Sequence, residues 1–139
     1  MKDHDLRSAI SIGWLSMFVV LVFNTVTELT MSIMRNDAVH WTQHHVGSEG
    51  LIASLALMPL YGLMPVLTHT VSGRWFKWVA VVLGALIGLI TVAHQISDWL
   101  EGERVWYSHA TFLVHHALAI LVLVASVRWL RSGTVNSRS

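Results

Sequence analysis

Long uninterrupted runs of apolar residues dominate this chain, and short polar segments separate them. A helix needs about 20 mostly apolar residues, each rising about 1.5 Å, to cross the hydrocarbon core of a bilayer. Four segments meet this requirement, at about residues 9–34, 51–71, 75–100 and 105–130. The pattern predicts an all-α integral membrane protein with one domain, residues 1–139, in which four transmembrane helices form a four-helix bundle with antiparallel neighbours.

Basic residues are distributed unequally between the two sides of these predicted spans. The first side would hold Lys2, Arg7, Arg74, Lys77, Arg128, Arg131 and Arg138, and the second side only Arg35 and Arg104. Cytoplasmic segments of membrane proteins carry the excess of lysine and arginine. This asymmetry predicts that both the N and C termini are cytoplasmic, and we expect the protein in the inner (plasma) membrane of a bacterium.

Tryptophan favours the two interfaces of a bilayer because its ring is apolar and its N–H group is polar. The predicted topology places four tryptophans near the inner interface and three near the outer one. The inner group is Trp14, Trp75, Trp78 and Trp129, and the outer group is Trp41, Trp99 and Trp106. The tryptophan positions therefore agree with the topology that the basic residues predict.

Composition narrows the classes of function. Only 12% of the residues are charged, against about 25% in soluble domains, so the main partner of this chain is expected to be the lipid bilayer. The absence of cysteine excludes disulfides, thiolate metal sites and c-type haem attachment. The basic residues form no dense cluster, which argues against a nucleic acid partner.

The third predicted span contains glycines at positions 84 and 88. Small residues four apart allow another helix to approach closely in lipid. Packing within the chain is the favoured interpretation of this face. The alternative is that the Gly84/Gly88 face joins a homo-oligomer or a larger membrane complex.

Ionisable residues inside a span are costly and normally face a partner or a cavity. Counting about 1.5 Å per residue from the outer boundary places Glu28 and His94 roughly 9 Å deep. The same count places His109 at roughly 6 Å, Asp98 shallower, and His115 and His116 at roughly 15 Å. All of these residues therefore fall in the outer half of the bilayer.

Helical phase brings most of these residues together. His94 and Asp98 share a face because they are one turn apart, and His109 and His116 share a face because they are two turns apart. Glu28 shares a face with Asn24. If the three faces converge, they form a pocket open to the outside, which His115 would approach from its flank. The predicted metal ligands are Glu28, His94, Asp98, His109 and His116, with His115 as a reserve ligand.

Imidazole and carboxylate groups together favour a transition metal such as Zn, Fe or Cu over calcium or magnesium. The spacing matches no fixed metal signature such as H-E-x-x-H. The sequence thus predicts a metal-binding membrane protein, and it leaves open whether the role is redox, metal handling or catalysis.

Three other functions fit the same residues. Haem b could take His94 with His109 or His116 as axial ligands, in a protein that transfers electrons. A proton-coupled transporter could use Glu28, His94 and His69 as a relay. The chain could also be an accessory subunit of a larger membrane complex. The histidines between the first two spans, His40, His44 and His45, could cap a short interfacial segment or help to capture a metal.

Overall fold

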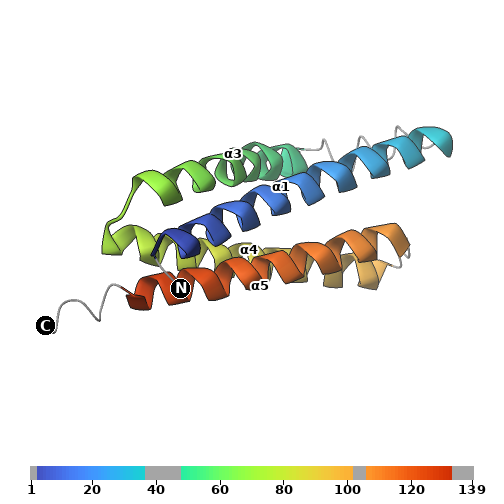
Figure 1. Ribbon diagram of the computed structural model, residues 1–139. Coiled ribbons are helices and arrows are strands. Elements are labelled where there is room, and N and C mark those ends of the chain that lie inside the picture. Colours follow the sequence, from blue (N-terminus) through green and yellow to red (C-terminus); the bar gives the residue numbers. More distant parts are fainter. Residues whose placement is uncertain (1–2, 37–47, 102–105, 133–139) are drawn as a thin grey trace, which may run out of the picture.

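The computed structural model describes residues 3–36, 48–101 and 106–132, without the side chains of residues 48–57, 94, 97, 98, 101 and 106–108. Within these ranges the chain forms four α-helices and no β-strand, which confirms the all-helical prediction. The helices are α1 (Asp3–Met34), α3 (Ser48–Thr70), α4 (Arg74–Glu101) and α5 (Trp106–Ser132) (Figure 1).

The four helices lie side by side, and consecutive helices run in opposite directions (Figure 1). Helix α1 packs against both α3 and α5, and α4 packs against α5. The start of α1 meets the end of α5, where the Trp129 indole N–H donates a 2.8 Å hydrogen bond to the Asp3 carboxylate. We call this end of the molecule the terminal end and the opposite end the distal end.

Three helices are long and apolar enough to cross a membrane, judged on the described residues: Asp3–Met34, Arg74–Ala93 and His109–Ser132. Many of their large apolar side chains point outward, including Val19, Phe23 and Leu113, which are 62–70% exposed. Such surfaces are typical of lipid contact, so an integral membrane protein is indicated. The fourth span, within α3, remains a prediction.

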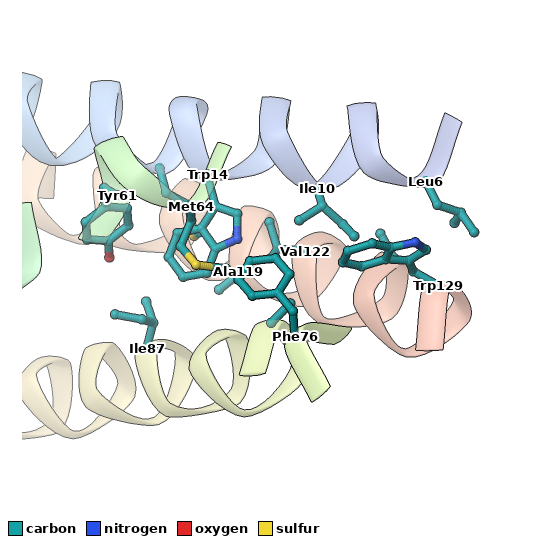
Figure 2. Packing of buried hydrophobic residues seen from close by; sticks show 13 residues of the cluster. Leu6, Ile10, Trp14, Tyr61, Met64, Phe76, Ile87, Ala119, Val122 and Trp129 are labelled. Carbon is teal, nitrogen blue, oxygen red and sulfur yellow. The ribbon is translucent and has the colours of Figure 1, made fainter. Parts of the chain in front are cut away.

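A core of interlocking aromatic and aliphatic side chains joins the helices in the half nearest the terminal end (Figure 2). The Trp14 and Tyr61 rings meet edge to face at 5.5 Å, and the Phe76 and Trp129 rings meet edge to face at 6.2 Å. These contacts link α1 to α3 and α4 to α5. Trp14 and Trp129 are therefore buried between the helices, and their depth in the bilayer remains a prediction.

The glycines of α4 face α5 of the same chain. A Cβ atom on Gly84 would lie 3.8 Å from the Leu123 Cα atom, and one on Gly88 would lie 4.0 Å from the Ala119 Cβ atom. This close approach of two helices confirms the interpretation that the small residues serve packing within the chain. A contact of this face with a second chain remains a prediction.

Charged side chains tie three helices together at the terminal end. Arg7 Nε donates to Asp3 Oδ2 at 2.7 Å, and Lys77 Nζ lies 3.6 Å from Asp3 Oδ1. Lys77 is only 8% exposed, and it also donates to the Trp129 carbonyl in the last turn of α5. A cation is favourable beside the last carbonyls of a helix because the helix dipole is negative at that end. We call Asp3, Arg7, Lys77 and Trp129 the terminal polar cluster.

Candidate functional site

The predicted ligands fall on three helices, and the structure describes four of the six side chains. Glu28 lies on α1, and His109, His115 and His116 lie on α5. His94 and Asp98 lie on α4, but their side chains are outside the described residues. The hydrogen bonds of these side chains separate them: Glu28 and His115 belong to the side of α5 that carries Thr111, and His109 belongs to the side that contacts α4.

Glu28 belongs to the face of α5 that contacts α1. Asn24 Nδ2 donates to Glu28 Oε1 at 2.6 Å, and Thr111 Oγ1 on α5 donates to Asn24 Oδ1 at 2.5 Å. The shared face of Asn24 and Glu28 was expected from their spacing. Their link to Thr111 shows that this polar group joins α1 to α5.

His115 lies on the same side of α5 as Thr111, one turn further from the distal end. Its ring is buried, and its Nε2 atom shares a 3.1 Å hydrogen bond with the Tyr61 hydroxyl of α3. Tyr61 is buried as well and packs against Trp14. His115 is therefore engaged with α3, and its predicted role as a reserve metal ligand remains a prediction.

His109 lies on the face of α5 that contacts α4. Its Nδ1 atom is 2.8 Å from Gln95 Nε2, a half-buried contact between the two helices. Because Gln95 lies opposite His109 and Gly88 lies opposite Ala119, residue 94 is placed between the levels of His109 and His116 along the helices.

His116 is oriented by its own helix. Its Nδ1 atom lies 2.6 Å from the Phe112 carbonyl oxygen. Only a protonated Nδ1 can donate to a carbonyl, so in the neutral ring the lone pair is on Nε2. A ligating histidine in proteins is usually held in this way, with one ring nitrogen on the metal and the other in a hydrogen bond that fixes the ring.

The described side chains alone do not assemble a metal site. Among them, no group of three His, Asp or Glu residues is close enough to hold an ion. The two α4 members of the predicted set, His94 and Asp98, are not in that comparison because their side chains are not described. The predicted metal site and the haem alternative therefore both remain predictions.

Several polar partners were not identified from the sequence. Tyr61, Gln95 and Thr111 each bond a residue of another helix. The spacing of Thr111 and His115, one turn apart, was a signal that could have placed them on one face. Tyr61 and Gln95 gave no such signal, since their partners lie on other helices at 54 and 14 residues' separation.

Comparisons with known proteins give no relative for this chain: no family model, no curated protein and no solved structure matches it.

Proposed function

We propose that this protein is an integral membrane four-helix bundle that binds one or two transition metal ions between α4 and α5, in the half nearest the distal end. The proposed ligands are the imidazoles of His94, His109 and His116 and the carboxylate of Asp98. With the termini in the cytoplasm, this site belongs to the outer half of the bilayer. The observation that carries the proposal is the fixed orientation of the two α5 histidines, whose Nδ1 atoms are both hydrogen-bonded.

The Nδ1 contacts leave Nε2 as the nitrogen for a metal on both rings. For His116 this needs no rearrangement, because Nδ1 already donates to the Phe112 carbonyl. For His109 the metal-bound ring would carry its proton on Nδ1. The Gln95 amide can accept a hydrogen bond from this Nδ1–H group if it presents its oxygen in place of its nitrogen, a rotation by half a turn.

The distance along α5 limits how one ion could bind. His109 and His116 are seven residues apart, about 10 Å along the helix axis, whereas metal–nitrogen bonds are about 2 Å long. One ion therefore belongs to the level of one histidine, and a second ion to the level of the other. Residue 94 lies between these levels, so His94 is the ligand common to both positions of an ion.

Metal analysis of the purified protein tests this proposal. Purified without chelators, the wild type is expected to retain about one or two transition metal ions per chain, and His94→Ala to lose nearly all of them. His109→Ala and His116→Ala should each lower the stoichiometry. The matched control is His69→Ala, because His69 is exposed near the terminal end and its loss should leave the metal content unchanged.

Two results would contradict the proposal. The first is a wild-type protein without metal above the level of the buffer. The second is a metal content that His94→Ala leaves intact while the variant remains folded in detergent. A visible spectrum of the same sample distinguishes the haem alternative, since a Soret band that His94→Ala abolishes would mean axial ligation of haem in place of a bare ion.

A further inference from the structure

Exposed arginine and tryptophan side chains gather where the start of α4 meets the end of α5. Trp75 is 66% exposed and Trp78 is 53% exposed. Arg74 on α4 and Arg128 on α5 are exposed as well. We call these four residues the basic aromatic patch. It lies at the terminal end, which the proposed topology places at the cytoplasmic interface.

The helices that carry the two halves of this patch are in contact at the terminal end. Lys77, one turn after Arg74, donates to the Trp129 carbonyl at 3.0 Å. Phe76 packs edge to face on the Trp129 ring. Arg74 and Arg128 therefore lie at the same end of two helices that pack against each other.

The Asp3 carboxylate at the terminal end is engaged outside the basic aromatic patch. The Asp3 carboxylate accepts from Arg7 and Trp129 and lies beside Lys77, so it already serves two cations. The first turn of α4 contains no acidic residue. Counting the described residues at this end, Arg7, Arg74, Lys77, Arg128 and Arg131 oppose Asp3 and Asp5, which leaves a net charge of about +3 at neutral pH.

Trp75 is held in an exposed orientation. Its ring meets Phe76 edge to face at 5.7 Å. A Cβ atom on Gly73 would lie 2.8 Å from Trp75 Nε1, so the indole rests against the short connection between α3 and α4, where the glycine leaves room for it. An exposed and ordered indole beside arginines suits the boundary between headgroups and acyl chains, where the ring is in apolar surroundings and the N–H group reaches polar ones.

We propose that the basic aromatic patch binds the headgroup of an anionic phospholipid. The guanidinium groups of Arg74 and Arg128 would pair with the phosphate, because arginine presents several N–H donors in a planar arrangement that fits phosphate oxygens. Trp75 and Trp78 would contact the upper part of the acyl chains. The proposal rests on the membrane placement given above, but it is independent of the metal site at the distal end.

Native mass spectrometry of the detergent-purified protein, with added lipid, tests this proposal. The wild type is expected to retain phosphatidylglycerol at least about fivefold more than phosphatidylcholine, the ratio that corresponds to the contribution of about 1 kcal/mol from one basic residue near an anionic surface. The double variant Arg74→Gln/Arg128→Gln should lose this preference. Arg35→Gln is the matched control, because Arg35 is an exposed arginine at the distal end and should leave the preference intact.

Three outcomes would overturn the proposal. The wild type could retain both lipids equally. The double variant could keep the full preference while its far-UV circular dichroism matches the wild type. Inorganic phosphate at millimolar concentration could displace the lipid completely, which would mark the patch as a site for a free anion. The metal content of the same samples separates this test from the test of the metal site, since the patch variants should leave it unchanged.

Discussion

Replacing Trp129 with alanine is expected to lower the free energy of unfolding in detergent by about 3–5 kcal/mol, the range for large aromatic residues removed from a packed core. The Trp129 side chain is completely buried between α1, α4 and α5. The substitution removes the hydrogen bond to Asp3, the edge-to-face contact with Phe76, and a ring face approached by Arg7 at 5.1 Å and by Lys77 at 4.9 Å. Unfolding by sodium dodecyl sulfate, followed by circular dichroism, measures the change.

The prediction concerns the side chain of residue 129 alone, because the alanine variant keeps the contacts of its backbone. The carbonyl oxygen that accepts from Lys77 Nζ and Ser132 Oγ is kept in the alanine variant. Trp75→Ala is the matched control, since Trp75 is mostly exposed and its loss should change the free energy of unfolding by less than about 1 kcal/mol. Equal destabilisation by both variants would show that Trp129 does not hold the terminal end together.

Trp129→Phe separates two contributions. Phenylalanine keeps an aromatic face for the two cations but has no N–H group for Asp3. A loss of about 1–2 kcal/mol is expected, because the donor on the charged carboxylate is missing while much of the packing remains. The difference between the two variants then reports the part that packing contributes.

The sequence was sufficient to predict the helices because a helix that crosses a bilayer needs about 20 mostly apolar residues. Each apolar block of about 20 residues corresponds to a helix, and α1 extends the first block back to Asp3, where Asp3 and Asp5 favour the start of a helix. The connection between α3 and α4 is short, as the predicted spans at about 51–71 and 75–100 imply. These features depend on composition along the chain and not on contacts between distant residues.

The faces of the helices were harder to predict. A helix in lipid is apolar on the side toward the bilayer and on the side toward its neighbours, so its hydrophobic pattern does not indicate which side is which. Lys77 illustrates this limit: the sequence assigned it only to the side of the spans that holds most basic residues, whereas in the structure it is buried and its ammonium group donates to the Trp129 carbonyl at the end of α5. Only the packing of α4 on α5 defines that partner.

The predicted pocket shows the same limit. Spacing within α5 grouped His109 with His116, and the structure places His109 toward α4, beside Gln95. Spacing could not place Glu28, because a residue on α1 can meet either face of α5 with the same spacing. The contact of Asn24 with Thr111 shows which face of α5 is nearer to Glu28: it is the face that carries Thr111 and His115.

Gly13→Ala is expected to lower the free energy of unfolding by about 1–3 kcal/mol, the usual effect of extra volume in a packed interface. A Cβ atom on Gly13 would overlap the Cγ2 methyl of Val122 on α5. Valine is branched at Cβ and has one strongly preferred rotamer in a helix, so the methyl has little freedom to move away. The helices α1 and α5 would therefore have to separate, and in lipid their association depends on such close packing.

An opposing effect acts on the same substitution, because alanine is favoured over glycine in a helix by about 0.5–1 kcal/mol. Gly62→Ala measures that effect alone, since a Cβ atom there meets nothing within 4 Å. We expect Gly62→Ala to be neutral or stabilising. A similar stabilisation by Gly13→Ala would show that α1 and α5 are not in close contact at this point.

The double variant Gly13→Ala/Val122→Ala decides whether the overlap is the cause. Val122→Ala alone should destabilise, because it leaves unfilled volume beside Gly13. If the new methyl on residue 13 occupies part of that volume, the double variant should be more stable than the sum of the two single changes predicts, by at least about 1 kcal/mol. Strict additivity would instead place the cost of Gly13→Ala in α1 itself and not in its contact with α5.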